Sequence, residues 1–471
     1  MNKKMIKMIV ASGLSIMAIA ILVGLGNKGI KMPKGIAVNA VVAEEVSTST
    51  IDFVKEKPVI ASVINNKNSI TIKWNRLDDA TGYYVYRDGK KIGQVKKQAK
   101  YTDKKANKNG SLYTFSVKAY KTIDGQKYES EMSPVVKNYF VKGNTIDVVS
   151  GNINVSWHKN SKVSGYQIQY STKKNFKNAK IKTIRGKKKK TVKLGKVNSK
   201  KNYYVRVRGY IKKGKKQYYS NWSACAERIV WNSKWEFAGF SKIHTDSTTL
   251  YFSNVAKPKN KTVCINAGHG TKGGESVKTL CHPDGSPKVT GGSTAAGATK
   301  AASVSGGTVL NDGTAESKAT LKVAMTVKEK LLKEGYNVLM IRESEDAQID
   351  NIGRTVYANN NADYHIAIHY DSTSSNKGAF YIGVPNVKSY RNMYPVSKNW
   401  KKHNKLGQNL VWGMKKAGVK IYGSGSMAID LTQTSYSTIA SVDLEVGDKK
   451  SDHSSKALKK IADGIVKGMN K

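Results

Sequence analysis

The sequence predicts a multidomain fold: two all-β sandwich modules, followed by an α/β domain whose central sheet is flanked by helices. This prediction rests on two features. Segments that alternate apolar and polar residues occur in two similar blocks between residues 57 and 232, and after about residue 260 short apolar strands alternate with segments of helical periodicity. Period-two alternation is typical of strands buried on one face, and strand–helix alternation is typical of an α/β sheet.

The N-terminal residues predict export. Three lysines precede an apolar run at 8–25, and small residues follow at 38–43. This order of basic, apolar and cleavage regions is that of a secretory signal peptide, which we assign to residues 1–43. We therefore expect a secreted, extracellular protein associated with the cell wall, with a linker at 44–56. The apolar run is also long enough for an uncleaved membrane anchor.

The charge predicts an anionic partner. The formal net charge is +48, and residues 141–230 alone contain 24 lysines and arginines against two acidic residues, Asp147 and Glu227. Such a surface attracts nucleic acid, anionic membranes or anionic wall polymers. Export favours a wall polymer such as teichoic acid. Nucleic acid is disfavoured because the basic run at 187–190 lacks the interleaved aromatic residues that stack on bases.

The three cysteines exclude a disulfide framework. Cys225, Cys264 and Cys281 are few and scattered, and no CxxC pair predicts a zinc site built from thiolates. Cys264 lies in an apolar strand, so we expect a buried, inert thiol there.

The repeated block consists of matching strands. Residues 69–74 match 152–157, both ending in tryptophan, and a Gly-Tyr pair follows in each copy, at Gly82 and Gly165. Two modules of such strands, 57–140 and 141–232, predict β-sandwiches. They resemble fibronectin type III modules, which implies spacers or binding surfaces rather than catalysis. Residues 233–260 are predicted to be a linker or extra strands.

The third domain, residues 261–471, is predicted from alternating strands and helices. The helix at 317–334 is predicted by apolar residues at three- and four-residue spacing and by the stop at Gly335. The other predicted elements are strands at 262–266, 336–342, 362–369 and 440–446 and helices at 354–361 and 451–469.

Side chains able to bind a metal or move a proton lie at the ends of these elements. His269 and His369 each follow or end a strand, Glu316 opens the long helix, and Glu445 ends a third strand. Ligands in α/β sheets bind beyond the carboxyl ends of strands. Glu445 also shares a strand face with Asp443, and acidic side chains in an apolar strand are costly to bury without a partner.

Each candidate has a structural alternative. His269 suits a glycine-rich turn, and His369 suits a loop. Glu316 suits the positive end of a helix dipole, with Thr314 as the N-cap. The glycines around His269 lack the spacing of a phosphate-binding loop, and no GxSxG motif is present. Two histidines and a carboxylate are, however, a common catalytic zinc set.

These residues occur in motifs that resemble a known family, the zinc-dependent N-acetylmuramoyl-L-alanine amidases of the secreted bacterial autolysin type. The motifs follow one another in the family's order: Ala267-Gly-His-Gly270, Glu316 with Leu321 and Ala324, Gly335-Tyr-Asn-Val338 leading to Arg342, Arg354 with Ala358 and Asn359, Ala362 to His369, and Glu445-Val-Gly447.

The resemblance implies a fold, a cofactor and a reaction. His269, Glu316 and His369 would bind Zn²⁺, and Glu445 would be the catalytic general base. The substrate would be peptidoglycan, cleaved at the amide between N-acetylmuramic acid and L-alanine. Two alternatives remain: a zinc peptidase acting on the stem peptide, and a non-catalytic basic protein that binds the cell wall.

The chain departs from the family pattern around the site. Asn266 replaces the usual aspartate before Gly-His-Gly, Tyr370-Asp371 replaces Ala-Asn after the third ligand, and Asp448 follows Gly447 where phenylalanine is usual. A long Gly/Ser/Thr-rich insertion, residues 271–315, separates the first two ligands.

Further side chains are expected around the ligands or against the substrate, namely Asn266, Asp443, Arg354 and His453. His365 is expected to be structural because four strand residues, ~13 Å, separate it from His369. His282, in the insertion, has no assigned role.

Overall fold

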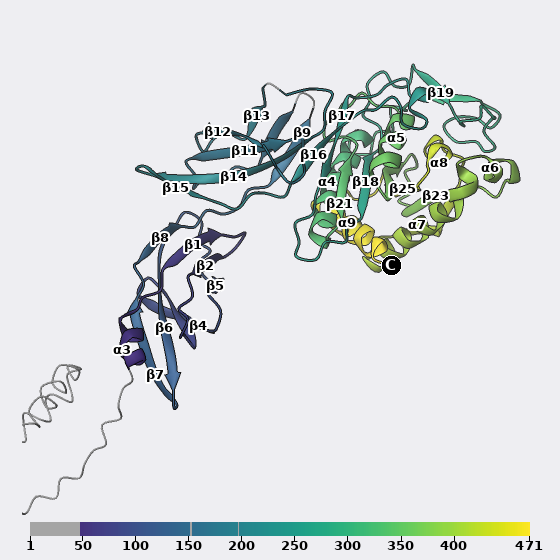
Figure 1. The fold of residues 1–471 in the computed structure, drawn as a ribbon. Coiled ribbons are helices and arrows are strands. Elements are labelled where there is room, and N and C mark those ends of the chain that lie inside the picture. The colour runs from purple at the N-terminus through teal and green to yellow at the C-terminus, as the bar shows by residue number, and fades with distance from the viewer. Residues whose placement is uncertain (1–47, 151–152, 196) are drawn as a thin grey trace, which may run out of the picture. The chain divides into compact units, whose positions relative to one another are not determined.

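The computed structural model describes residues 48–150, 153–195 and 197–471 (Figure 1). The predicted signal peptide, residues 1–43, lies outside the described residues, as does the first part of the predicted linker. Within the described ranges, no helix is long and apolar enough to cross a membrane. Helix α3 (Thr48–Lys55) precedes the first module in the sequence.

The first module is a sandwich of two antiparallel sheets. One sheet has the order β1-β2-β5 and the other β4-β3-β6-β7, with β8 also paired to β6. Trp74 and Tyr83 are buried in its core with ring centroids 5.3 Å apart. The strands are β1 (Ile60–Asn65), β2 (Ile70–Trp74), β3 (Gly82–Arg87), β4 (Lys90–Lys96), β5 (Lys100–Asp103), β6 (Leu112–Ile123), β7 (Gln126–Met132) and β8 (Val136–Tyr139).

The second module repeats this arrangement. Its sheets have the orders β9-β10-β13 and β12-β11-β14-β16, with β15 paired to β14. Trp157 and Tyr166 pack in its core as their counterparts do in the first module, with ring centroids 5.2 Å apart. The strands are β9 (Ile146–Ser150), β10 (Asn154–Trp157), β11 (Gly165–Ser171), β12 (Lys180–Arg185), β13 (Thr191–Lys193), β14 (Tyr203–Lys213), β15 (Lys216–Tyr219) and β16 (Ala226–Val230). The predicted β-sandwich fold is confirmed.

The segment between the second module and the α/β domain contains the short helix η1 (Ala238–Phe240) and strand β17 (Ser247–Tyr251). Strand β17 pairs antiparallel with β16 of the second module and with β21 of the α/β domain. Trp231 and Trp235 lie just before η1 in the sequence and pack edge-on against Tyr357 of the α/β domain. These residues are therefore folded into the structure around them.

The C-terminal domain is built on one sheet with the order β21-β18-β22-β25-β23-β24. Strands β21, β18, β22 and β25 are parallel, and β23 is antiparallel to β25. The strands are β18 (Thr262–Ala267), β21 (Asn337–Met340), β22 (Tyr364–Asp371), β23 (Ala379–Gly383), β24 (Ile421–Ala428) and β25 (Ala440–Asp448). The helices are α4 (Glu316–Glu334), α5 (Asn351–Asn361), α6 (Lys388–Asn392), α7 (Val396–Lys416), α8 (Thr432–Tyr436) and α9 (Ser455–Met469).

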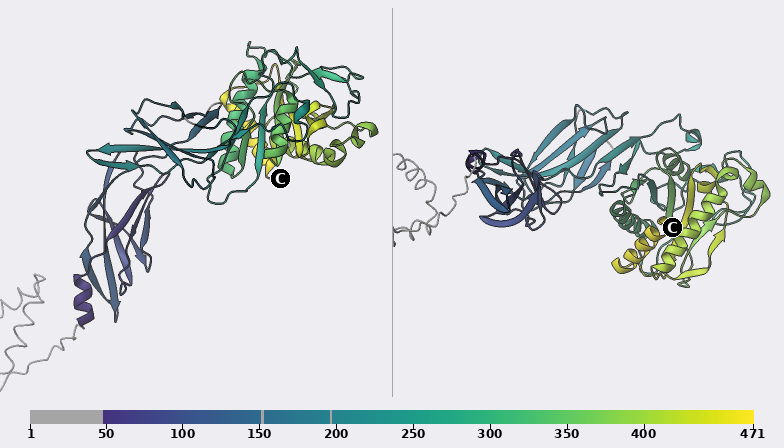
Figure 2. Two further views of the ribbon diagram at one scale, coloured as in Figure 1. Left: turned by 45° about the horizontal axis from the view of Figure 1, so that its top comes forward. Right: turned by 60° about the horizontal axis from the view of Figure 1, so that its bottom comes forward.

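Helices cover both faces of this sheet (Figures 1 and 2). Helices α4, α7 and α9 pack against the face that carries Val263, Ile368 and Leu444, and these residues are fully buried. Helix α5 packs on the opposite face, against Cys264 and Leu339. That opposite face also carries the candidate site residues of β22 and β25, because side chains alternate along a strand. The predicted α/β fold is confirmed, although α7, β23 and β24 were not predicted.

Candidate metal centre

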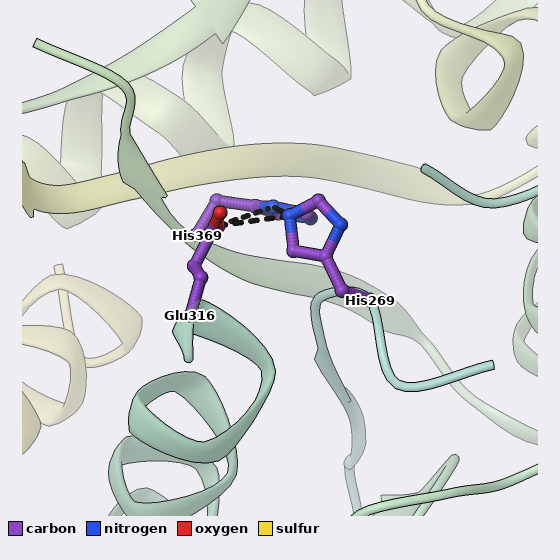
Figure 3. Close-up of side chains that lie close together, drawn as sticks. All are labelled: His269, Glu316 and His369. Atoms are coloured by element: carbon purple, nitrogen blue, oxygen red, sulfur yellow. Dashed lines mark hydrogen bonds and ion pairs between the residues drawn. The ribbon is translucent and has the colours of Figure 1, made fainter. Parts of the chain in front are cut away.

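Three predicted site residues meet at the carboxyl edge of the sheet (Figure 3). Strand β18 ends at Ala267 and turns through Gly268 into His269, while its parallel neighbour β22 carries His369 near its own end. The Gly268 amide donates to the carbonyl of Ile368 at 3.0 Å, which fixes the turn beside β22. Helix α4 begins with Glu316 at the same edge, so residues distant in sequence come together.

The three side chains point their ligand atoms at one another. His269 Nε2 lies 2.9 Å from Glu316 Oε1, and His369 Nδ1 lies 3.1 Å from the same oxygen and 3.0 Å from His269 Nε2. Within the described residues, this is the group of three whose donor atoms suit a metal ion. Glu316 and His269 are buried, whereas the His369 side chain is 19% exposed.

The hydrogen bonds around this cluster fit a bound cation. His269 Nδ1 lies 2.8 Å from the carbonyl of Ser305, an acceptor, so this nitrogen carries the proton in the neutral ring. The lone pair of Nε2 then faces the carboxylate of Glu316. Two acceptors 2.9 Å apart need a proton or a cation between them. Two imidazoles and a carboxylate form the donor set of three-ligand zinc sites.

Backbone amides orient the Glu316 carboxylate. Thr308 N donates to Oε2 at 2.9 Å, and Tyr370 N donates to Oε1 at 3.0 Å. Burial raises the pKa of Glu316, but the neighbouring imidazoles of His269 and His369 outweigh burial and hold that pKa well below its usual range. The carboxylate is thus ionised and preoriented at the start of α4, where the helix dipole favours negative charge.

The predicted N-cap of α4 is wrong. The N-cap position is Ala315, which makes no side-chain cap hydrogen bond. The hydroxyl of Thr314 donates instead to Asp312 Oδ2 at 3.1 Å. The helix start is stabilised by Glu316 and by loop contacts rather than by a capping side chain.

Two buried arginines hold the turn that carries His269. Arg354 donates to Asn266 Oδ1 at 2.9 Å and to the carbonyl of His269 at 2.7 Å. Arg342 donates to the carbonyls of Gly268 and Ser317, each at 2.7 Å. Arg354 and Asn266 were predicted near the ligands and contact each other there. Arg342 was not predicted in this role, since its signals were its place at the end of an apolar strand and in a family motif, and neither specifies which carbonyls it contacts.

Glycine is required at two positions of the cluster. A Cβ on Gly268 would overlap the imidazole of His369. A Cβ on Gly307 would lie 2.8 Å from the His269 ring, and Gly307 has a φ of 81°, in the left-handed region. At both positions the backbone therefore approaches a histidine ring more closely than a residue with a Cβ would permit.

Glu445 and Asp443 lie beside the cluster on β25. Glu445 is the register partner of His369 across the β22–β25 pair, and Asp443 lies two residues earlier on the same face. Burial and the neighbouring Asp443 raise the pKa of Glu445, although His369 opposes this effect. Among the described residues, Glu445 Oε2 and Asp443 Oδ1 have no hydrogen-bond partner. Buried polar atoms without a partner are uncommon in folded proteins.

The remaining histidines lie outside the three-residue cluster. His365 is fully buried, with Nδ1 3.2 Å from the hydroxyl of Ser441, and burial lowers its pKa to about 3. His453 Nε2 lies 2.9 Å from Asp312 Oδ2, in the loop before α4. His453 therefore contacts the loop that leads to Glu316 and not the candidate ligands themselves.

The insertion, residues 271–315, is anchored by a buried polar network. Asp430 accepts hydrogen bonds from Lys288 Nζ at 2.9 Å and Val289 N at 2.7 Å, and it lies 3.1 Å from His282 Nε2. Strands β19 (Lys278–Leu280) and β20 (Lys300–Ala302) form a hairpin in this segment. The insertion then supplies Ser305, Gly307 and Thr308 to the cluster. Its composition alone did not predict this role.

The fold and the site define the class of the C-terminal domain: an α/β domain with a His-Glu-His cluster at the carboxyl edge of its sheet. Residues 263–471 match the family described as N-acetylmuramoyl-L-alanine amidase, and residues 142–225 match the fibronectin type III domain. The C-terminal domain belongs to this amidase family, and a fibronectin type III domain precedes it.

The chain is also similar to solved structures. One is the apo form of the N-acetylmuramyl-L-alanine amidase Ami1 from Mycobacterium abscessus, at 17% identity over 45% of this chain and 97% of that chain, with a TM-score of 0.36. Another is the N-acetylmuramoyl-L-alanine amidase from Clostridium difficile 630, at 17% identity over 45% and 95% of the two chains, with a TM-score of 0.32. The FN1-FN3 domains of chicken CNTN1 match at 20% identity over 36% and 64%, with a TM-score of 0.20. No curated protein matches the chain significantly.

Proposed function

We propose that the C-terminal domain hydrolyses the amide between N-acetylmuramic acid and L-alanine in peptidoglycan, with zinc as cofactor. The observation that carries this proposal is the convergence of His269, Glu316 and His369 within hydrogen-bond distance, beside the half-buried Glu445 on the neighbouring strand. Three protein ligands leave one coordination position open in a four-coordinate site, as catalytic zinc sites require.

His269 would bind the metal through Nε2, Glu316 through Oε1 and His369 through Nδ1, since these atoms face one another. A bound zinc ion polarises an amide carbonyl and lowers the pKa of water toward neutrality. The backbone donors at Thr308 and Tyr370 keep the carboxylate of Glu316 oriented while the ligand set assembles.

Glu445 would act as the general base. It accepts a proton from the attacking water and then delivers it to the nitrogen of the departing L-alanine amine. Burial and the charge of Asp443 raise the pKa of Glu445, which makes its carboxylate a stronger base than an exposed one. No other donor among the described residues occupies Oε2, so its lone pairs are free to accept this proton.

We further propose that the protein acts outside the cell, held on the wall by its second module. The lysines at 187–190, 200–201, 212–213 and 215–216 are exposed. The module contains only two acidic residues that could neutralise them, and one of these, Glu227, is buried. A uniform positive surface of this kind attracts anionic polymers such as teichoic acid.

An end-group assay on purified peptidoglycan tests the reaction. We expect the full-length protein with zinc to release new α-amino groups on L-alanine, with no new reducing sugar and no other new amino terminus. New amino termini within the stem peptide would indicate a peptidase. Binding to walls without any new end group would indicate a non-catalytic protein.

A further inference from the structure

Asp443 contacts the one ring nitrogen of His369 that does not face the cluster. His369 Nδ1 points at His269 and Glu316, whereas Nε2 lies 3.8 Å from Asp443 Oδ2. The side chains of His369 and Asp443 are 19% and 15% exposed, so both are largely shielded from water. Asp443 Oδ1 has no hydrogen-bond partner among the described residues.

A histidine can bind a metal through Nδ1 only if its proton sits on Nε2. In a largely buried site that N–H needs an acceptor, because an unpaired buried donor is costly. The other ligand meets this requirement through the backbone, since His269 places its outer nitrogen 2.8 Å from the carbonyl of Ser305. For His369, the group beside the outer nitrogen is the carboxylate of Asp443.

We propose that Asp443 is the positioning residue that fixes His369 as an Nδ1 metal ligand. A shortening of the 3.8 Å separation by about 1 Å would bring Nε2–H into hydrogen-bond distance of the carboxylate. Carboxylates in this outer position orient a metal-binding imidazole and raise its basicity. This inference rests on the proposed function, because it concerns how the metal would be held.

The role of Asp443 is separate from that of Glu445. Both side chains project from the same face of β25, but only Asp443 has a described contact with an imidazole nitrogen. Glu445 remains the group that handles the proton of the reaction. Asp443 would therefore act on metal affinity and ring orientation, which can be measured without any substrate.

The test uses the full-length protein and its Asp443→Leu and Asp443→Asn variants. Leucine suits an apolar strand and removes the acceptor, while asparagine keeps the shape and an acceptor oxygen. Asp371→Asn is the control. It also removes a negative charge near Glu445, but the Asp371 carboxylate pairs with Lys377, at 2.8 Å. Zinc affinity is measured by competition with a chelator, and ¹⁵N chemical shifts of the His369 ring report which nitrogen carries the proton.

We expect Asp443→Leu to weaken zinc binding by about 10- to 100-fold, as loss of an outer partner usually does. Asp443→Asn should lose less zinc affinity, and the zinc affinity of the control should stay within about twofold of the wild type. In Asp443→Leu, the Nε2–H form of the His369 ring should no longer predominate. If the leucine variant does not fold, the asparagine variant decides by its affinity and ring shifts.

Wild-type zinc affinity and ring shifts in both variants would overturn the inference. So would a complete loss of zinc equal to that of His369→Ala, which would make Asp443 a direct ligand. If zinc affinity depends on Asp443 as expected but the wild-type protein releases no L-alanine amine, only the proposed function is contradicted. A wild-type protein that binds no zinc would contradict both.

Discussion

The two acidic side chains on one face of β25 show how strongly the environment of a residue determines its chemical role. Glu445 and Asp443 are both half-buried carboxylates, and both have raised pKa values caused first by burial. Only Asp443 has a described contact with a histidine nitrogen, at 3.8 Å. For these residues, geometry rather than residue type separates the proposed base from the proposed positioning group.

Glu445→Gln should abolish hydrolysis while keeping zinc and the fold. The amide cannot accept a proton, and the three ligand side chains are unchanged. Loss of a general base usually lowers the rate by ~10²–10⁴-fold. The measurement is the turnover number, with zinc content and circular dichroism as controls. Near-wild-type turnover would show that another group is the base.

His269→Ala and His369→Ala should each lose zinc together with activity, whereas His365→Ala should retain both. His365 is buried against Ser441 and lies outside the three-residue cluster. Zinc content after dialysis is the measurement. A folded His365→Ala protein that held no zinc would contradict this assignment.

The turn after β18 shows what a whole element contributes to the site. It places His269 at a φ of 58°, in the left-handed region, and Arg354 and Arg342 hold its carbonyls from two other elements. Backbone strain of this kind persists only where surrounding contacts determine it. Buried charge-assisted hydrogen bonds from these arginines fix the carbonyls of the turn.

Gly268→Ala should disrupt the metal centre. The added methyl group would overlap the His369 ring, so either the imidazole or the turn must move. We expect zinc affinity to fall at least ~10-fold, comparable to the loss of an outer partner of a ligand. Chelator competition is the measurement. Gly291→Ala is the matched control, because its Cβ would have nothing within 4 Å; equal affinities in the two variants would contradict the prediction.

For the whole molecule, strand β17 joins the second module to the catalytic domain. It pairs with β16 on one side and β21 on the other, and Leu250 packs in one cluster with Leu339 and Ile341. The predicted domain start at residue 261 would leave this strand out. The edge of β21 and part of an apolar cluster would then face water.

A fragment of residues 261–471 should be less stable than one of residues 231–471. The longer fragment keeps β17 and both tryptophans that pack on Tyr357. Each fully buried large apolar side chain contributes roughly 1.5–3 kcal/mol, so the shorter fragment should unfold at a clearly lower temperature or aggregate. Thermal unfolding followed by circular dichroism is the measurement. Equal midpoints would mean that β17 adds no stability.

The charge of the second module should hold the full-length protein on walls that contain teichoic acid. Replacing the exposed lysines 187–190 by glutamine should weaken wall binding, and binding should fall as salt rises, because the Debye length shrinks from about 10 Å at 0.1 M to about 3 Å at 1 M. The control replaces exposed lysines of the first module, Lys96, Lys97, Lys104 and Lys105. Co-sedimentation with walls before and after teichoic acid removal is the measurement. Equal binding to stripped walls, or no salt dependence, would contradict the proposal.

Local sequence patterns were enough to predict the order of the domains along the chain, the class of chemistry and the candidate metal ligands. The patterns are period-two strands, a helical stripe, and histidines and glutamates placed at the ends of elements. The family motifs added the expected reaction. Nothing in these patterns needs a contact between distant segments.

The support of the site became visible only in the folded chain. His282 meets Asp430 across 148 residues of sequence, Ser305 reaches His269 across 36, and Asp443 meets His369 through the register of two parallel strands. Such contacts depend on how loops pack and how strands align, and sequence spacing does not encode either. The groups that could bind a metal could therefore be read from the sequence, whereas the groups that orient them required the tertiary structure.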